Sequence, residues 1–387
     1  MTAAIIALAF LAPQQDQYPV YESDRTPPAE LRQRRERLMQ QMEPGSAAII
    51  FTNPERNRNN DTDYLFRPDS DFLYLAGFDE PSAALVLVPD GVTYGGKRVR
   101  EALFVNESSA MSITWLGYRM GPQGAMRLLG VELALPGSEF ASVLPKLLAG
   151  STVKKLSIVS PPDPSGTIAS MLQAAREWRT STGAGEGPAL RARIEAMRGV
   201  KSATEIAFIK KAAEISARGH AEAMRSAIPG MREYEIAAIV RYVFARQGAE
   251  FEGYPAICGA GVNSTILHYN TNRGPTEAGQ VMLVDAAAEY RGYSADVTRT
   301  FPISGKWSKE QRAIYEVVLR AQNAGIALCR PGVNQQQISR AVSDELAKGL
   351  TELGLIKERS ELSRFYMHGF GHGIGLDVHD PSPGTLQ

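Results

Sequence analysis

The chain has 387 residues, of which 44% are apolar and 22% charged, which is ordinary for a globular protein. This length exceeds what one compact core usually organises, so we expect two domains. The 42 basic and 42 acidic residues cancel, so no charge surplus indicates a nucleic-acid partner or an acidic tail. The two cysteines, Cys258 and Cys329, lack zinc-site or redox spacing and are predicted to be free thiols.

An unbroken apolar run over residues 3–12 opens the chain and is too short to cross a bilayer as a helix. It is consistent with the apolar region of an export signal, for which the alanines offer a cleavage site, or with a core element. No Lys or Arg precedes the run, and Pro13 follows it directly. We predict an export signal over residues 1–17, which makes the protein periplasmic or secreted. The alternative, a core element, makes it cytoplasmic.

The first half of the chain reads as an α/β domain. A charged helix over residues 30–42 ends at Pro44-Gly45, and a short apolar strand follows over residues 47–51. Residues 72–76 and 83–88 are predicted to be further strands, separated by glycine and proline. Strands and helices then alternate to about residue 180, which favours a domain of moderate size.

A glycine-rich segment, residues 181–188, is the most linker-like part of the sequence. A helical run follows it, and a new helix begins at Ser202, which forms a capping box with Glu205. We therefore expect a boundary near residue 195, with an N-terminal mixed α/β domain over residues 18–195. Residues 196–387 would form the second domain.

Two aspartates lie in a predicted β-hairpin of the second half. An apolar strand runs into Asp285, the pair Arg291-Gly292 provides a turn, and Asp296 lies on the returning strand. In that register the carboxylates share one face as diagonal neighbours, with backbones roughly 7–8 Å apart. They would repel each other unless a cation lies between them. A structural network with Arg291 or Arg299 is the alternative.

Histidines gather in a second segment, MHGFGHGIGLDVHD, residues 367–380, which holds three of the five in the chain. An extended strand here would place His368 and His372 on one face and bare glycines on the other, with His379 beyond a bend. His268 lies in a separate polar loop. Carboxylate and imidazole ligands suit manganese, cobalt, iron or zinc, and carboxylates that bridge two metals make a hydrolytic site.

These motifs resemble aminopeptidase P, the proline-specific branch of the pita-bread metallopeptidases. The resemblance rests on VMLVDAAAEYRGYSADVTRTFP at residues 281–302 and on the histidine segment. Residues 43–51, EPGSAAIIF, and residues 70–81, SDFLYLAGFDEP, resemble the non-catalytic N-terminal domain of that family. The implied fold is an N-terminal mixed α/β domain followed by a pita-bread α+β catalytic domain. The implied reaction removes an N-terminal residue that precedes proline.

The resemblance also implies roles for single residues. Asp285 and Asp296 would bind two divalent ions, with Mn²⁺ as the expected metal, together with His372. His268 and His379 would hold the substrate and stabilise the tetrahedral intermediate, and His368 would line the proline pocket. The implied partners are proline-containing peptides and further copies of the chain in a dimer or tetramer, with no nucleic acid and no membrane span.

The family completes its site with two glutamates that follow the histidine segment, whereas the printed chain ends at Gln387. We therefore expect a C-terminally truncated catalytic domain that is inactive by itself. A prolidase that cleaves Xaa-Pro dipeptides is the first alternative function. A pita-bread protein that binds peptides without cleaving them is the second, and it is disfavoured because such relatives tend to lose the metal ligands.

Overall fold

The computed structural model describes residues 18–21 and 23–387, so the predicted export signal lies outside the described residues. The chain divides into two compact units, residues 1–195 and 196–387, and each is described by itself. Among the described residues, no helix has the length and apolar character that crossing a bilayer requires.

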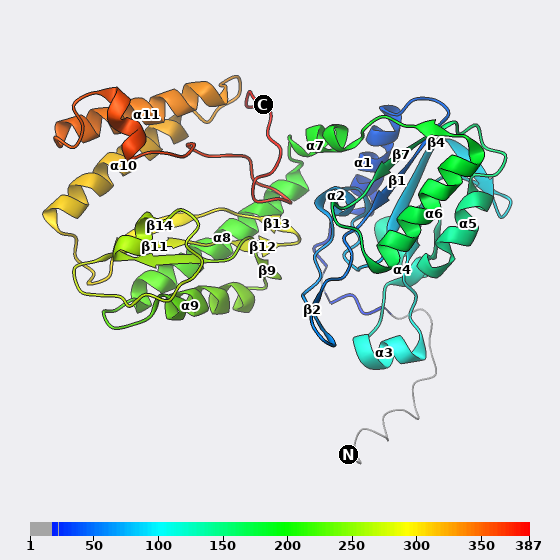
Figure 1. The fold of residues 1–387 in the computed structure, drawn as a ribbon, viewed down its shortest axis with the longest axis horizontal. Coiled ribbons are helices and arrows are strands. Elements are labelled where there is room, and N and C mark those ends of the chain that lie inside the picture. Colours follow the sequence, from blue (N-terminus) through cyan, green and yellow to red (C-terminus); the bar gives the residue numbers. More distant parts are fainter. Residues whose placement is uncertain (1–17, 22) are drawn as a thin grey trace, which may run out of the picture. The chain divides into compact units, whose positions relative to one another are not determined.

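The first unit is built on a mixed six-stranded sheet of order β6-β5-β4-β1-β7-β8 (Figure 1). Its sheet strands are β1 (Ser46–Phe51), β4 (Ala84–Tyr94), β5 (Lys97–Val105), β6 (Ala134–Pro136), β7 (Lys155–Val159) and β8 (Gly185–Glu186). A separate hairpin consists of β2 (Asn57–Asn59) and β3 (Thr62–Asp63). Its helices are α1 (Pro28–Gln40), α2 (Ser70–Ala76), α3 (Ala110–Leu116), α4 (Gly121–Leu129), α5 (Phe140–Leu147), α6 (Gly166–Thr182) and α7 (Arg191–Arg198), the last of which runs into the second unit.

Both faces of this sheet are covered. Every residue of β1 is buried, which is typical of a central strand between two layers. Ile49 and Phe51 pack with Phe140 of α5 and with α6 on one face, while α1, α2 and α4 contact the strands from the other. The strand predicted over residues 47–51 is therefore confirmed, and it lies at the centre of the first core.

The prediction of a strand over residues 72–76 is wrong, because α2 occupies this segment. Asp69 caps the helix, since its side chain accepts a hydrogen bond from the Phe72 amide at 3.0 Å. Gly77 ends the helix with a φ of 67°, in the left-handed region that glycine tolerates. These two caps override the strand preference of the short apolar run between them.

The glycine-rich segment at residues 181–188 is ordered within the first unit and is not a free linker. Helix α6 continues to Thr182, and Gly183 ends it with a φ of 68°. The chain then adds β8 to the sheet edge, parallel to β7. Gly183 supplies the left-handed conformation that ends α6, so the prediction of a linker over this segment is not met.

The second unit combines two three-stranded sheets with two pairs of helices. The sheets have the orders β10-β11-β14 and β13-β12-β9. The strands are β9 (Phe251–Glu252), β10 (Ile257–Ala260), β11 (Val281–Asp285), β12 (Ala288–Tyr290), β13 (Tyr293–Ser294) and β14 (Thr298–Pro302). The helices are α8 (Ala203–Ser226), α9 (Glu233–Arg246), α10 (Lys309–Ala327) and α11 (Gln335–Glu352), with 3-10 turns η3 (Gly261–Thr265) and η4 (Arg359–Arg364).

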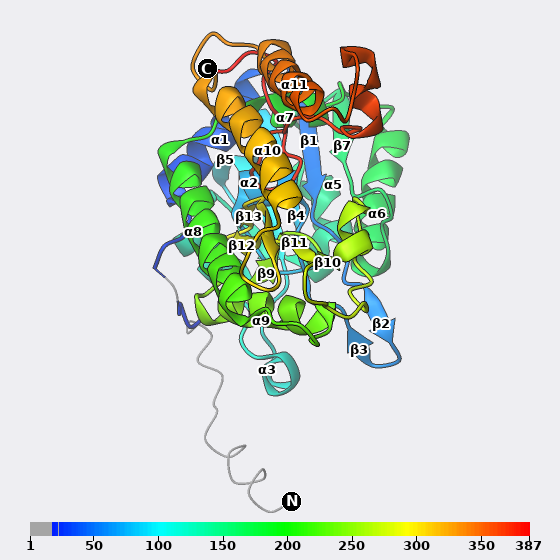
Figure 2. The ribbon, with the colours of Figure 1, turned by 90° about the vertical axis from the view of Figure 1, so that its left-hand side faces the viewer.

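Helices α8 and α9 bury their apolar stripes against one face of the β10-β11-β14 sheet. Met282 and Val284 of β11 point into that core, where they meet Ile236 and Phe244 of α9. Side chains alternate along a strand, so Asp285 points to the opposite face. Helices α10 and α11 pack side by side in a second layer of the unit (Figure 2). The capping box predicted for Ser202 and Glu205 is confirmed at the start of α8.

One carboxyl group of the first unit is buried with only half of its hydrogen-bonding capacity used. Glu80 lies between α2 and β4 and is 8% exposed. Its Oε1 accepts a hydrogen bond from the Met120 amide at 2.8 Å, while Oε2 has no partner among the described residues. Burial raises the pKa of Glu80 to about 7.

We predict that the stability of the first unit falls as pH rises from about 4.5 to 8, because the folded state holds the Glu80 proton more tightly than the unfolded chain does. Full ionisation should cost about 3 kcal/mol at 1.36 kcal/mol per pKa unit. The substitution Glu80→Gln should flatten this dependence in thermal unfolding followed across that range. Glu107→Gln, at an exposed position, should leave the dependence unchanged. A Glu80→Gln profile parallel to wild type would contradict the prediction.

Candidate active site

The register of the β-hairpin brings the two aspartates to one face, as predicted. Tyr290 of β12 pairs with Tyr293 of β13 around the turn, and Asp285 of β11 pairs with Thr298 of β14 in the other sheet, with the same register. Arg291 and Gly292 have φ values of 54° and 79°, the left-handed pair that a type I′ two-residue turn requires. Asp296 therefore lies two positions from the partner of Asp285, on the same face.

Tyr254, which sequence analysis missed, joins the two carboxylates. Its hydroxyl lies 2.5 Å from Asp285 Oδ1 and 3.0 Å from Asp296 Oδ1, and it can donate to either oxygen. Burial, followed by the charge of Asp285, raises the pKa of Tyr254 far above its usual value, so the hydroxyl keeps its proton. Tyr254 follows β9 without any motif around it, so no sequence signal could have identified it.

The negative charges of the two aspartates are not neutralised by any described arginine, as expected of a cation site. Burial raises the pKa of Asp285, and the nearby charge of Asp296 raises it further. Arg291 pairs with Glu250 at 2.5 Å, and Arg299 donates to the Thr298 carbonyl at 2.8 Å. Within the described residues, no arginine pairs with Asp285 or Asp296, so the structural Asp–Arg network is not formed.

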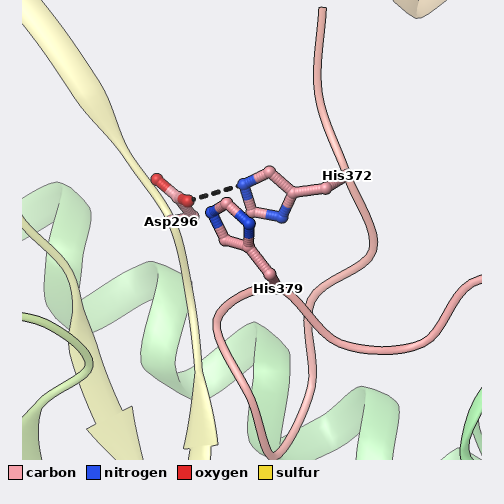
Figure 3. Close-up of side chains that lie close together, drawn as sticks. All are labelled: Asp296, His372 and His379. Carbon is pink, nitrogen blue, oxygen red and sulfur yellow. Dashed lines mark ion pairs between the residues drawn. The ribbon is translucent and has the colours of Figure 1, made fainter. Parts of the chain in front are cut away.

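Two histidines of the C-terminal segment close on Asp296 (Figure 3). His372 Nε2 lies 3.1 Å from Asp296 Oδ2, and the rings of His372 and His379 stack with centroids 3.8 Å apart. One ligand atom from each of the three residues lies within 4.8 Å of the others. Sequence positions more than 75 residues apart thus converge on one point.

The histidine segment is a closed loop, so the prediction of an extended strand is wrong. The Asp380 amide donates to the Gly373 carbonyl at 3.0 Å, and the Gly375 amide donates to the Asp377 carbonyl at 3.1 Å. A Cβ on Gly373 would lie 2.8 Å from the Asp380 carbonyl oxygen. The glycines therefore allow the chain to fold back on itself, and this is how His379 returns to His372.

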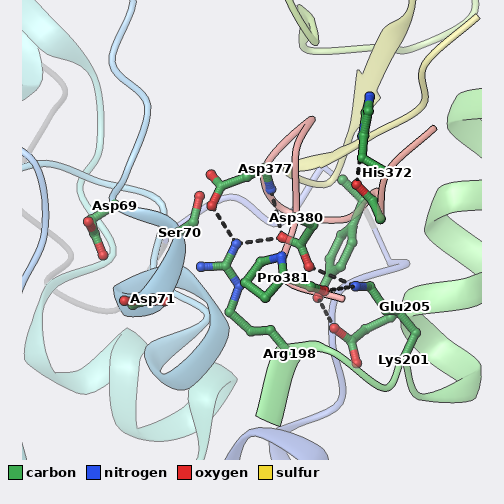
Figure 4. A network of polar contacts seen from close by, with 12 residues as sticks. Asp69, Ser70, Asp71, Arg198, Lys201, Glu205, His372, Asp377, Asp380 and Pro381 are labelled. Atoms are coloured by element: carbon green, nitrogen blue, oxygen red, sulfur yellow. Dashed lines mark hydrogen bonds and ion pairs between the residues drawn. The ribbon is translucent and has the colours of Figure 1, made fainter. Parts of the chain in front are cut away.

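A buried ion-pair network anchors this loop within the second unit (Figure 4). Asp380 is 5% exposed and accepts from Arg198 at 2.5 Å and from Lys201 at 2.7 Å. Arg198 also contacts Asp377 at 2.6 Å. Removing one partner of such a buried network leaves an uncompensated charge, so the anchor holds His379 firmly.

The other two predicted site histidines lie outside the ligand cluster of the described residues. His268 is exposed in the loop that follows η3. His368 is also exposed, and its ring packs edge-on against Tyr366 with centroids 4.8 Å apart. The structure thus brings together Asp285, Asp296, His372 and His379 through Tyr254 and the histidine pair, whereas His268 and His368 lie outside this group.

The residues present fit a divalent metal centre. Carboxylate oxygens and imidazole nitrogens are the ligands that Mn²⁺, Co²⁺, Fe²⁺ and Zn²⁺ accept in proteins. The crowding of Asp285 and Asp296 on one hydroxyl, which cannot donate fully to both, is relieved by a cation between them. We therefore expect Asp285, Asp296 and His372 to bind metal on the face of the hairpin that points away from α8 and α9.

Comparisons with known proteins identify the family of each unit. A family model for metallopeptidase family M24 matches residues 207–386, and one for the aminopeptidase P N-terminal domain matches residues 31–156. The Xaa-Pro aminopeptidase of Haemophilus influenzae is 38% identical over 366 residues, which cover 92% of this chain and 81% of the relative.

Solved structures are similar over nearly the same extent. Pseudomonas aeruginosa aminopeptidase PepP matches with a TM-score of 0.85 at 35% identity, covering 94% of this chain and 84% of that one. Zinc-substituted aminopeptidase P of Escherichia coli in complex with product matches with a TM-score of 0.83 at 35% identity, covering 93% of this chain and 83% of that one. With an N-terminal domain and a pita-bread second unit of this kind, the chain belongs to the aminopeptidase P (Xaa-Pro aminopeptidase) branch of metallopeptidase family M24.

Proposed function

We propose that this protein is a dinuclear-metal aminopeptidase that removes an N-terminal residue preceding proline. The observation that carries the proposal is the convergence of Asp296, His372 and His379 within 4.8 Å, beside Asp285 on the same hairpin face. The names of the relatives support the Xaa-Pro specificity. The bond before proline has no N–H, which favours an enzyme with a dedicated pocket for it.

In this proposal Asp285, Asp296 and His372 hold two divalent ions, with Mn²⁺ as the first expectation. When bound, such ions supply Lewis acidity that activates water and polarises a carbonyl group. Tyr254 stays protonated and orients the two carboxylates through its hydroxyl. Because three ligand side chains are too few for two ions, the proposal includes two further glutamate ligands, which the family resemblance implies.

The remaining histidines are proposed to contact the substrate. His379 donates a hydrogen bond to the oxygen that becomes negatively charged as water attacks, for which its position beside His372 is suited. His268 holds the peptide, and His368 lines the pocket for the proline side. Residues 18–195 then serve as the N-terminal domain and residues 196–387 as the catalytic domain. Assembly into a dimer or tetramer stays a prediction that light scattering can test.

We predict faster hydrolysis of Xaa-Pro-Xaa peptides than of matched Xaa-Ala-Xaa peptides in the presence of Mn²⁺. The assay should use the protein carried to the length of its relatives, of which the printed chain covers 81%. Steady-state kinetics on both peptide series measure the preference. Equal values of kcat/KM for the two series would exclude proline specificity, and cleavage restricted to dipeptides would establish the prolidase alternative.

We predict that Asp296→Ala and His379→Ala fail in different ways. Asp296→Ala removes a ligand, so bound metal and activity should be lost together. His379→Ala should retain the metal and lower kcat on the order of 10²–10³-fold, the usual effect of losing one donor to a developing oxyanion. Metal analysis of each purified variant beside its kinetics separates the two roles. Loss of metal from His379→Ala would instead make His379 a ligand.

A further inference from the structure

The loop that carries His268 is closed by one buried carboxylate, Glu233. This residue begins α9 and is fully buried, with an exposed fraction of 0%. Its Oε1 accepts from the Ala260 amide at 2.8 Å and from Asn263 Nδ2 at 2.9 Å. Its Oε2 accepts from the Gly274 amide at 2.6 Å and from the Tyr269 hydroxyl at 2.7 Å. All four donors belong to the segment from residue 260 to residue 274.

Both ends of that segment are therefore tied to the same side chain. The Ala260 amide is where β10 leaves the sheet, and Gly274 is where the chain returns, pairing its carbonyl with the Glu233 amide at 3.0 Å. A Cβ on Gly274 would lie 2.9 Å from Glu233 Oε1, so glycine permits this approach. Asn272 adds a buried contact to the Cys258 amide at 2.8 Å.

Between these anchors the tip of the loop is exposed and has few contacts of its own. Ile266 and Leu267 are 51% and 54% exposed, and His268 is exposed as well. Tyr269, which follows His268 directly, returns to Glu233 through its hydroxyl. The position of the His268 backbone thus depends on the Tyr269 contact.

Four hydrogen bonds explain how Glu233 stays buried without a cation. The four donors use the acceptor capacity of the carboxylate, and the N-terminus of α9 adds the positive end of a helix dipole. A buried carboxylate satisfied in this way holds its donors strongly, because an unpaired backbone amide in the interior is costly. The helix-capping role at this helix start belongs instead to Glu235, whose Oε2 accepts from the Arg232 amide at 2.6 Å.

We propose that Glu233 is a positioning residue, which acts on peptide hydrolysis by holding the His268 loop in place. The inference rests on the proposed substrate-binding role of His268. Among the described residues, the side chain of Glu233 hydrogen-bonds neither to the proposed metal ligands nor to the proposed substrate-binding histidines, so its effect passes through the loop. It sets the backbone on both sides of His268 and thereby where the imidazole meets the peptide.

The first test is amide hydrogen exchange in the printed chain carrying Glu233→Gln. A glutamine amide presents one acceptor oxygen, so either the Ala260 or the Gly274 amide loses its partner. Exchange over residues 260–275 should be faster than in wild type. Glu235→Gln, on the same helix turn, keeps a capping side chain and should match wild type. Unchanged exchange in Glu233→Gln would overturn the proposal. If that variant does not fold, Tyr269→Phe removes one of the four donors and should give a smaller acceleration.

The second test is a double-mutant cycle on Xaa-Pro-Xaa hydrolysis by the protein carried to the length of its relatives. Glu233→Gln should lower kcat/KM about 10-fold or more, since small misplacements of a binding group cost this much. In a His268→Ala background, Glu233→Gln should lower kcat/KM less than about 2-fold, because Glu233 is proposed to act through His268, which is already removed. Metal content should be unchanged throughout.

The outcomes of the two tests distinguish the positioning role of Glu233 from the substrate-binding role of His268. An equal loss in both backgrounds would contradict an effect through His268. His268→Ala without any loss of kcat/KM would remove His268 from the proposed function, whereas the exchange experiment would still decide whether Glu233 holds the loop.

Discussion

The site depends on two carboxylates that the β-hairpin forces onto one face. The turn at Arg291-Gly292 fixes the register, and the register places Asp285 and Asp296 within reach of a single Tyr254 hydroxyl. That arrangement is unfavourable for two charges in the absence of a cation, because both lose solvent and repel each other. A bound metal would turn this cost into affinity, which supports our proposal that the hairpin is a cation site whose geometry is set by backbone pairing.

The two loops that carry the site histidines are each anchored by a buried carboxylate of their own. The histidine loop depends on Asp380, which Arg198 and Lys201 hold in the interior. The His268 loop depends on Glu233 at the start of α9. Polar loops thus gain defined positions from charges that they enclose, while the apolar contacts of α8 and α9 stabilise the sheet behind them. Separate anchors allow each loop to be perturbed without unfolding the sheet.

The hairpin could be predicted from sequence because its turn chemistry and strand alternation are local. The capping box at Ser202 was predictable for the same reason. Tyr254 and Glu233 were not, since their roles arise from partners 27 to 42 residues away and neither lies in a periodic pattern. The prediction of a strand for the histidine segment was wrong because alternating glycines are compatible with a strand and with a tight loop. Its closure at Gly373 and Asp380 depends on a tertiary contact.

The most direct test of the metal site is anomalous diffraction at the manganese edge from crystals of the Mn²⁺-loaded protein. We expect two peaks roughly 3.5–4 Å apart, the separation of two-metal hydrolytic sites. Asp285, Asp296 and His372 should ligate them, with Asp296 between the two. No anomalous peak at the hairpin, or metal bound only elsewhere on the chain, would contradict this account.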